Sequence, residues 1–385
     1  MLLAISAATL AAWLYLAFFR GFYWRADTRL EPAPAPSTWP EIVAIIPARN
    51  ERETIAQVVA AHDATDYPGP FRVILVDDES ADGTAEAAKT AAGSRRELTI
   101  VAAPPLAGGW SGKLAAMNAG LVAARNAAPE ASYILFADAD IAIGRTTLRR
   151  LVAKAEDENL AIVSLMSRLD SRGCWGGLLI PAFVYFFQKL YPFPWTNDPK
   201  RRTAAAAGGC MLVRRDALVA AGGLEPIRGA LIDDCALAAL IKGAGRPIWI
   251  GVAGADDAAS LRDNRRLSSI WSMVARTAFA QLRRSRLLLA VTAVGMAVVY
   301  GGPPAIALSY PLHRDELAGA AALGAWILMA ATYGPTVRLY GVHPLGAALL
   351  PVSATLYLLM TLSSALRHAR GREGFWKGRY APREA

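Results

Sequence analysis

Short apolar runs alternate with amphipathic stretches between residues 41 and 137 of the chain. The short runs are typical of buried strands, and stretches in which apolar residues recur every three or four positions are typical of helices. This alternation predicts an α/β fold whose mostly parallel sheet is covered by helices on both faces. The expected strands are 42–46, 71–76, 98–101 and 133–137, and the expected helices are 54–65, 84–92 and 113–126.

Four longer stretches contain no charged residue: 1–19, 287–312, 317–337 and 344–366. Each is close to the ~20 residues that a helix needs to cross a bilayer. They help to raise the hydrophobic fraction to 54%, above the roughly 45–50% of soluble domains. We therefore expect an N-terminal transmembrane anchor at 1–19 and transmembrane or re-entrant helices across 287–366.

Basic residues beside these stretches predict an orientation in the membrane. Arg20 and two further arginines follow the first stretch, so the positive-inside rule places the next domain in the cytoplasm. The basic tail 367–385 also favours the cytoplasmic side. If all three C-terminal stretches crossed the membrane, however, this tail would lie outside. Because Gly301-Gly302-Pro303-Pro304 interrupts the helical pattern, we expect 287–312 to be re-entrant.

Three other segments fit neither pattern. We expect a Pro-rich linker at 31–40, an interfacial aromatic segment at 174–195 and a basic amphipathic membrane-surface helix at 262–286. The net charge of +9 raises the question of nucleic acid, but the basic residues gather beside apolar segments. Attraction to anionic lipid headgroups explains that placement better, so we expect no nucleic-acid partner. The three cysteines show no metal-ligand spacing, as expected for reduced thiols.

The motif Asp138-Ala139-Asp140 follows the apolar strand at 133–137. Side chains two apart on a strand share a face, so both carboxylates can approach one cation. Oxygen ligands of this kind suit Mg²⁺ or Mn²⁺, which bind through one or two carboxylates together with substrate phosphates. A helix cap ahead of 146–155 is the structural alternative.

Further polar residues follow the neighbouring strands. Pro47-Ala-Arg-Asn-Glu51 comes after the first strand and Asp77-Asp78 after the second. Ligands of parallel sheets bind beyond the carboxyl ends of the strands, so these residues should meet Asp138-Ala-Asp140 in one crevice. A carboxylate of the Asp77-Asp78 pair is placed to accept the N–H of a uracil ring, and a capped turn is the alternative.

Two further motifs lie at the starts of predicted helices. Lys113 follows a glycine-rich loop and is a candidate neighbour of a diphosphate, although the loop fails the P-loop template because Leu114 replaces Ser or Thr. Asp233-Asp234 opens another helical pattern. These aspartates suit either the helix dipole or a general base, and the sequence alone does not choose between them.

Taken together, these motifs resemble the inverting family 2 glycosyltransferases of the GT-A fold. The order of the motifs over residues 41–250 carries the resemblance, and it continues through Gly208-Gly209 to Asp233-Asp234. A closer resemblance is to the hopene-associated glycosyltransferases of hopanoid-making bacteria. It rests on Gly109-Trp-Ser-Gly-Lys113, Ile180–Phe193, Gly208–Leu212, Ala230–Leu237 and Met273–Phe279.

The resemblance implies a GT-A (Rossmann-like) cytoplasmic domain at 41–255, with membrane helices on either side. It also implies a role for each matching residue. Asp140 with Asp138 would hold Mg²⁺ or Mn²⁺ and the diphosphate, Asp234 with Asp233 would supply the base, and Arg276 would support the leaving group. The nucleotide-sugar site would comprise Pro47, Arg49, Asn50, Glu51, Asp77, Asp78, Lys113, Asp138, Gly208 and Gly209.

The sequence departs from this family in two motifs. Family members often carry Glu-Asp where this chain has Asp233-Asp234, which is a conservative change. Many membrane relatives carry Gln-x-x-Arg-Trp after the base, where this chain reads Ser272-Met-Val-Ala-Arg276-Thr277. Only Arg276 is retained as a candidate, which makes processive polymer synthesis a weaker alternative.

We expect a multi-pass enzyme of the bacterial inner membrane that transfers a hexosyl or N-acetylhexosaminyl group. The donor would be a nucleotide diphosphate sugar, expected to be a UDP-sugar, and the acceptor a lipid such as a hopanoid. The alternatives are a polyprenyl-phosphate glycosyltransferase, a polysaccharide synthase, a catalytically silent scaffold and a soluble nucleotidyltransferase. The sequence leaves open which sugar and lipid react, how many segments span and which oligomeric state forms.

Overall fold

The computed structural model describes residues 1–371. The chain divides into two compact units, each described here by itself. The sheet unit comprises residues 28–170 and 195–262 among those described. The helical unit comprises residues 1–27, 171–194 and the described part of 263–373.

The sheet unit is built on seven strands in the order β3-β2-β1-β4-β7-β6-β8. Its strands are β1 (Ile42–Ala48), β2 (Phe71–Asp77), β3 (Glu97–Ala102), β4 (Tyr133–Ala137), β6 (Ile162–Met166), β7 (Cys210–Arg214) and β8 (Ile248–Val252). Every neighbouring pair is parallel except those of β7, which runs antiparallel to β4 and β6. The predicted mostly parallel α/β sheet is confirmed.

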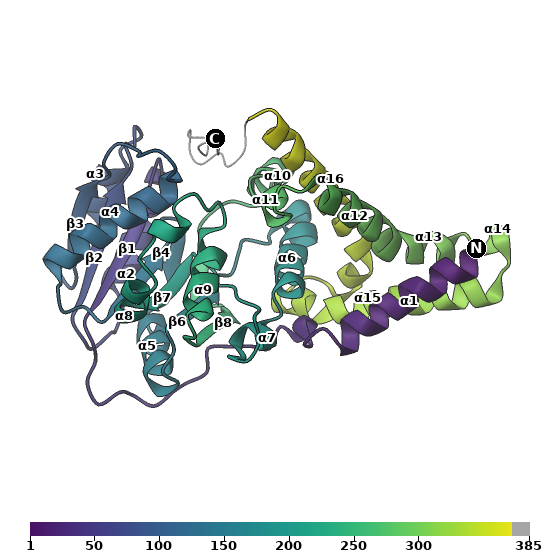
Figure 1. Cartoon of the computed structure of the whole chain (residues 1–385), viewed down its shortest axis with the longest axis horizontal. Helices are drawn as coiled ribbons and strands as arrows, with labels where there is room; N and C mark the ends of the chain where they lie inside the picture. The colour runs from purple at the N-terminus through teal and green to yellow at the C-terminus, as the bar shows by residue number, and fades with distance from the viewer. Residues whose placement is uncertain (372–385) are drawn as a thin grey trace. The chain divides into compact units, whose positions relative to one another are not determined.

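Alternate side chains of the central strands enter two separate cores. On β1, Ile42, Ala44 and Ile46 belong to one core, whereas Val43 and Ile45 belong to the other. The first core is covered by α2 (Arg52–Asp63), α3 (Thr84–Ala91) and α5 (Thr147–Asp157). The second is covered by α4 (Gly112–Ala127), α8 (Arg215–Ala220) and α9 (Asp233–Gly243) (Figure 1). Helices therefore cover both faces of the sheet, as the period-two burial of β1 requires.

The elements predicted from the hydrophobic pattern lie where expected, with small differences at their ends. Strand β1 extends to Ala48, so that Pro47 pairs in register with Val76 of β2. Helix α4 begins at Gly112, because the Ser111 side chain caps it by accepting the N–H of Leu114 at 3.4 Å.

A second, two-stranded sheet lies beside the metal motif predicted from the sequence. Strand β5 (Ile141–Ile143) directly follows Asp140 and pairs antiparallel with β9 (Ala258–Ser260). Asp138-Ala-Asp140 therefore leads into a strand, and the structural alternative of a helix cap is wrong.

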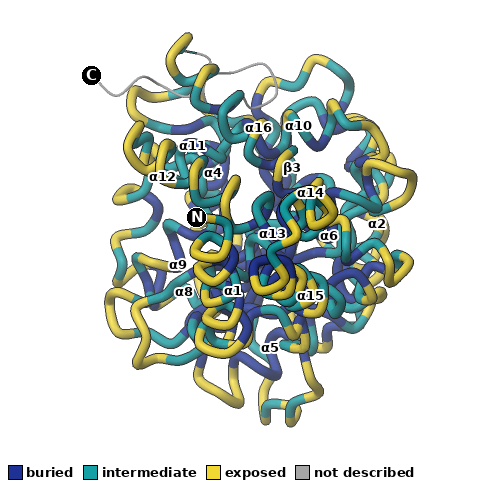
Figure 2. The backbone as a smooth tube through the Cα atoms, turned by 90° about the vertical axis from the view of Figure 1, so that its right-hand side faces the viewer, coloured by how far each residue is buried: buried dark blue, intermediate teal, exposed yellow. Residues whose placement is uncertain are grey.

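The helical unit contains three helical stretches long and apolar enough to cross a membrane: Arg286–Leu308, Glu316–Leu339 and Pro344–Ala369. Its elements are α1 (Leu2–Phe18), η1 (Tyr23–Arg25), α6 (Gly173–Leu190), α10 (Leu267–Ala275), α11 (Ala278–Gln281), α12 (Arg286–Met296), η3 (Ala297–Gly301), α13 (Gly302–Leu308), α14 (Tyr310–His313), α15 (Glu316–Leu339), η4 (Pro344–Leu349) and α16 (Leu350–Ala369). The short helix α7 (Phe193–Asn197) falls at a boundary between the units. Helix α1, the predicted anchor, is apolar but shorter than the three spans. It packs along α15, and both helices expose many turns (Figure 2).

The expected interruption at Gly301-Gly302-Pro303-Pro304 is not a break. Helix α12 passes through the π-helical turn η3 directly into α13. The two prolines lie in the first turn of α13, where a missing N–H is tolerated, and the wider π turn accommodates them. The stretch is therefore long enough to span, and the sequence argument for a re-entrant segment fails.

The expected surface helix at 262–286 is also divided. Helices α10 and α11 are separate, and Arg283 and Arg284 adopt left-handed backbone conformations with φ of 53° and 54°. Such conformations end a helix, so the basic segment is a pair of short helices followed by a turn. Of the predicted basic tail 367–385, residues 372–385 lie outside the described part of the chain.

Candidate active site

The carboxyl end of β4 places Asp138 beside a glycine pair. The N–H of Asp138 donates to the carbonyl of Gly209 at 3.3 Å, immediately before β7. A Cβ on Gly209 would lie 2.9 Å from Cγ1 of Ile141, so a larger residue would displace β5. Gly209 therefore fixes the main chain of the metal motif, which is a different role from lining the sugar.

Lys113 links two of the predicted acidic motifs. Its Nζ lies 2.8 Å from Oδ1 of Asp138 and 3.0 Å from Oδ2 of Asp233. Burial of Lys113 opposes its charge, but Asp138 and Asp233 outweigh burial and raise the pKa of the ammonium above its usual value. Lys113 is thus a permanent cation between the end of β4 and the start of α9.

Asp234 is held by two main-chain donors at the first turn of α9. Its Oδ2 accepts the N–H of Gly208 at 2.9 Å, and its Oδ1 accepts the N–H of Cys235 at 2.7 Å. Burial, followed by the charge of Asp233, raises the pKa of Asp234 to about 6, while Lys113 and the two N–H groups oppose the rise. A carboxylate that is fixed in position and titrates near neutral pH has the properties of a general base.

Gly208 lies close to these groups. A Cβ at Gly208 would lie 3.3 Å from Cβ of Asp234 and 3.4 Å from both Oδ2 of Asp234 and Nζ of Lys113. Gly208 therefore lies directly against the acid and the ammonium, and its place beside a sugar or an acceptor stays a prediction.

Asp140 lies in a separate ion-paired group. Its Oδ2 is 2.9 Å from Nε of Arg262, and the same guanidinium lies 3.3 Å from Oε1 of Glu51. Burial is the largest influence on Asp140 and raises the pKa of its carboxyl group, although Arg262 opposes this. Arg262 thus connects the loop after β1 with the metal motif.

Arg262 is a site residue that the sequence interpretation missed, because it was assigned to the basic membrane-surface segment. Its position follows from β9, which pairs with β5 and carries the chain back to Asp140. The N–H of Leu261 donates to the carbonyl of Asp140 at 2.8 Å. The only signal in the sequence for this position of Arg262 was the short strand β9 just before it. That strand pairs with β5, which lies more than 100 residues earlier in the chain.

The loops after β1 and β2 are locked together. Asn50 has a φ of 51°, its N–H donates to Oγ of Ser80 at 3.0 Å, and its Oδ1 accepts the N–H of Ala81 at 2.9 Å. Asn50 is therefore a loop-positioning residue. Glu51 extends the link, since its N–H donates to Oγ1 of Thr84 at 2.9 Å.

The two aspartates after β2 differ in accessibility. Asp78 is 2% exposed and lies 3.5 Å from NH1 of Arg49, which also donates to the Asp78 carbonyl. Asp77 is half-buried, and its Oδ1 accepts the N–H of Ser80 at 3.3 Å. A contact between Asp77 and a nucleobase therefore needs less rearrangement than one by Asp78, because Asp78 is ion-paired with Arg49.

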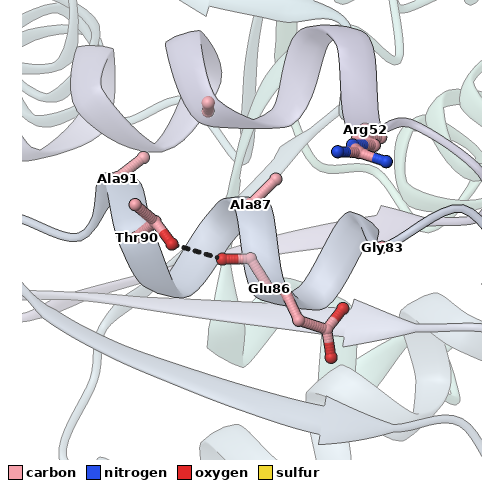
Figure 3. A pocket seen from close by; sticks show the side chains of 7 residues that line it. Arg52, Gly83, Glu86, Ala87, Thr90 and Ala91 are labelled. Carbon is pink, nitrogen blue, oxygen red and sulfur yellow. Dashed lines mark hydrogen bonds between the residues drawn. The ribbon is translucent and has the colours of Figure 1, made fainter.

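Arg276, predicted to support the leaving group, belongs to the helical unit, where it ends α10. An open groove between α2 and α3 is lined by Arg52, Glu86, Thr90 and small residues (Figure 3). None of the predicted site residues lines this groove, so the groove is not part of the candidate active site.

Asp138 and Asp140 fit a divalent metal only if oxygens of a bound substrate complete its coordination. Among residues 1–371, no group of three or more His, Cys, Asp or Glu side chains is arranged to hold a metal ion. Asp138 and Asp140 each face a cationic side chain, so their oxygens already neutralise positive charge. Two carboxylates completed by phosphate oxygens match the usual preference of Mg²⁺ and Mn²⁺.

Residues 43–220 match the family described as Glycosyl transferase family 2. Among solved structures, the mannosyltransferase PcManGT from Pyrobaculum calidifontis, in complex with GDP-Man and Mn²⁺, is 22% identical. The match covers 97% of this chain and 100% of that chain, with a TM-score of 0.55. No curated protein matches the chain.

Two further matches are weaker and carry no argument here. Glucosyl-3-phosphoglycerate synthase from Mycobacterium tuberculosis, in complex with Mn²⁺, UDP-Glc and glycerol 3-phosphate, is 21% identical over 63% of this chain and 80% of that chain, with a TM-score of 0.39. Mannosyl-3-phosphoglycerate synthase from Rubrobacter xylanophilus is 19% identical over 69% and 83%, with a TM-score of 0.40.

The family match covers β1 through β7, and the similarity to PcManGT shows a shared fold. Residues 43–220 are therefore similar to the domains of Glycosyl transferase family 2, and the fold is GT-A-like.

Proposed function

We propose that the chain is a metal-dependent, inverting glycosyltransferase that moves a sugar from a UDP-sugar to the hydroxyl group of a membrane lipid. The observation that carries the proposal is the geometry of Asp234. Two main-chain N–H groups fix its carboxylate, and Lys113 connects the adjacent Asp233 to the metal motif. A base and an anion-binding group thereby lie together at the ends of the strands.

Asp234 removes the proton from the acceptor hydroxyl as its oxygen attacks the anomeric carbon. The new glycosidic bond forms on the face opposite the leaving diphosphate, while the bond from the anomeric carbon to the diphosphate oxygen breaks. The electron pair of that bond leaves with the diphosphate, and the proton remains on Asp234. The configuration at the anomeric carbon is therefore inverted.

Charge on the leaving diphosphate is neutralised by groups at the end of β4. Asp138 and Asp140 would hold Mg²⁺ or Mn²⁺, which supplies Lewis-acid stabilisation of the departing diphosphate when bound. Lys113 binds a diphosphate oxygen by exchanging part of its contact with Asp138, and Arg262 keeps Asp140 oriented. We assign Arg276 to the same leaving group, as the family resemblance implies.

The nucleotide is bound by the loops after β1 and β2. Asp77 accepts the uracil N–H, while Asp78 and Arg49 hold the loop and Asn50 locks it to Ser80. Pro47 and Glu51 lie at the end of β1 and position this loop, and Gly208 borders the sugar. The Mn²⁺ and nucleotide sugar of PcManGT support a donor and metal of this class.

A lipid acceptor is supported by the helical unit, whose described residues include three helices of membrane-spanning length. We place the enzyme in a bacterial inner membrane as a multi-pass protein with its sheet unit in the cytoplasm. The hopene-associated resemblance makes a hopanoid the first acceptor to test.

The test uses the full chain purified in detergent with Mn²⁺. Individual UDP- and GDP-sugars are incubated with a bacterial lipid extract that contains hopanoids, and the lipids are analysed by mass spectrometry. The proposal predicts a lipid that gains the mass of one sugar only with a UDP-sugar. Transfer only from a GDP-sugar, or only to a water-soluble acceptor, contradicts it.

A further inference from the structure

After α15 the chain of the helical unit turns back along the same helix. Trp326, near the middle of α15, donates from Nε1 to the carbonyl of Ala348 in η4 at 3.1 Å. Because an α-helix rises about 1.5 Å per residue, this contact lies about 20 Å back from Leu339, where α15 ends. Helix α16 therefore begins, at Leu350, beside the middle of α15 and not beyond its end.

The other end of α16 is held beside α10 and α11. Oγ of Ser363 accepts the indole N–H of Trp271 at 3.1 Å. Oγ of Ser364 accepts the main-chain N–H of Phe279 at 3.0 Å. Helix α11 leads through a short turn into α12, where the candidate span Arg286–Leu308 begins. Helix α16 therefore ends on the side of the helical unit where that span starts.

The end of α15 lies on this side too. The candidate spans Arg286–Leu308 and Glu316–Leu339 are antiparallel, because Ile306 near the end of the first packs against Ala318 and Ala322 near the start of the second. The chain thus leaves α15, returns to the middle of that helix, and comes back along α16 to the side it left. Figure 1 shows α16 running steeply across the direction of α15. This is the path of a re-entrant segment.

The two faces of η4 and α16 suit contact with lipid on one side and with protein on the other. Four apolar side chains spaced seven residues apart are 45–76% exposed: Leu345, Val352, Leu359 and Leu366. On the buried face of α16, the hydroxyls of Ser353 and Tyr357 donate to main-chain carbonyls of α6 at 3.0 and 2.9 Å. Backbone that is not α-helical is tolerated at membrane depth where protein satisfies it, as Trp326 does for Ala348.

The charges of the helical unit distinguish its two sides. Residues 264–314 and 317–371 contain no Asp or Glu. The side on which α16 ends carries arginines at the ends of four helices: Arg276, Arg286, Arg338 and Arg370. The turn on the opposite side carries Arg314 beside Asp315 and Glu316. The positive-inside rule therefore assigns the end of α16 to the cytoplasmic surface.

We propose that η4 and α16 form a re-entrant membrane segment whose partner is the bilayer itself. Its apolar face contacts acyl chains as deep as the bilayer centre near Leu349, and its basic end returns to anionic headgroups of the cytoplasmic leaflet. The chain then crosses at α1, Arg286–Leu308 and Glu316–Leu339, which leaves the end of α16 in the cytoplasm. The proposal concerns the helical unit by itself and does not depend on sugar transfer.

The first test measures depth in the bilayer with nitroxide labels on single cysteines. The full chain carries Cys174→Ser, which leaves two buried cysteines, and is reconstituted in vesicles of phosphatidylethanolamine and phosphatidylglycerol. Power-saturation EPR compares the accessibility of each label to oxygen and to a water-soluble nickel chelate. The ratio of oxygen to nickel accessibility should be severalfold higher for Leu349→Cys than for Leu359→Cys, and lowest for Leu366→Cys.

Two exposed positions serve as depth controls. Ile327→Cys, in the middle of α15, should be deep, and Leu312→Cys, between the first two candidate spans, should be shallow. A helix that crosses the bilayer would have its deepest label at Leu359→Cys, near the midpoint of α16. That result, or labels equally shallow at all α16 positions, overturns the proposal.

The second test determines the side on which α16 ends. Ala369→Cys, at the exposed end of α16, and Leu312→Cys are each labelled with a membrane-impermeant maleimide in spheroplasts, before and after lysis. We expect Leu312→Cys to react in intact spheroplasts and Ala369→Cys to react at least tenfold more after lysis than before. Reaction of both cysteines from the same side overturns the proposal.

Discussion

Lys113 places its ammonium nitrogen 3.0 Å from the carboxylate of Asp233. The two residues lie 120 positions apart, at the first turns of α4 and α9, which cover the same face of the sheet. The contact brings the helix that carries Asp234 to the end of β4, where Lys113 also meets Asp138. It therefore joins the proposed base to the proposed metal motif.

Replacing Lys113 by Gln should weaken both the fold and the reaction. The change leaves Asp138 and Asp233 without their shared cation, so we expect the free energy of unfolding to fall by about 1–3 kcal/mol, less than for a fully buried pair because Lys113 is partly exposed. The rate of sugar transfer should fall about 100-fold. Urea unfolding and donor turnover measure the two effects. Lys89→Gln, at an exposed position of α3, is the control and should change neither.

Asp234→Asn should slow turnover strongly without preventing donor binding. Loss of a general base typically costs about 10²–10⁴-fold in rate. We expect kcat to fall within this range and the Kd for the UDP-sugar to change less than about threefold, because the proposed role of Asp234 is toward the acceptor and not the donor. Asp216→Asn removes an exposed aspartate of α8 and should leave kcat unchanged. A fully active Asp234→Asn variant would remove Asp234 from the mechanism.

The pH dependence should show the raised pKa of Asp234. The base must be deprotonated, so kcat/KM should decline as the pH falls through about 6. Folding stability should respond in the opposite sense. Because the pKa of Asp234 rises from its ordinary value of 3.8 to about 6 on folding, the folded state holds an extra proton between these pH values, and stability should fall as the pH rises through that window. Asp234→Asn should lose this part of the stability profile. An acid limb centred near pH 4 in the wild-type enzyme would contradict the assignment.

Removal of the metal should be reversible and should depend on Asp140. We expect chelation with EDTA to stop turnover and added Mn²⁺ or Mg²⁺ to restore it. Asp140→Asn should raise the Mn²⁺ concentration for half-maximal activity about tenfold, the effect of removing one carboxylate ligand. Asp157→Asn, at the exposed end of α5, serves as the control. Full activity after exhaustive chelation would argue against a metal at this position.

Gly120 should be intolerant of any side chain. A Cβ at this position of α4 would lie 2.3 Å from Cγ2 of Ile45, so Gly120→Ala forces α4 away from β1. Overpacking of this kind costs about 1–3 kcal/mol in unfolding free energy. Gly243→Ala, at the end of α9 where nothing lies within 4 Å, should be neutral or slightly stabilising. Chemical unfolding of both variants measures the difference.

The sequence could predict the elements that depend on local pattern. Period-two burial and the acidic residues at strand ends located β1, β2, β4 and their polar loops, because each signal lies within a few residues. It could not predict that Lys113 reaches Asp233, since that contact depends on how two helices pack on one sheet. Arg262 was hidden for the same reason, because its partner Asp140 is reached through the pairing of β5 with β9.

In the helical unit, two expected helix boundaries differ from the structure, because the backbone adopts conformations that the residue pattern does not reveal. Prolines suggested a break near Gly301, but their placement in the first turn of α13 and the π turn before it preserved the helix. The basic segment suggested one helix, but Arg283 and Arg284 adopt left-handed conformations that composition does not reveal.

The proposed reaction is an inverting sugar transfer in which Asp234 is the base. The most direct test is the anomeric configuration of the product, determined by NMR after reaction of an α-configured UDP-sugar with the lipid acceptor and Mn²⁺. We expect a β-linked sugar from the wild-type enzyme and at least about 100-fold slower product formation by Asp234→Asn. An α-linked product, or product formed equally well by Asp234→Asn, would contradict it.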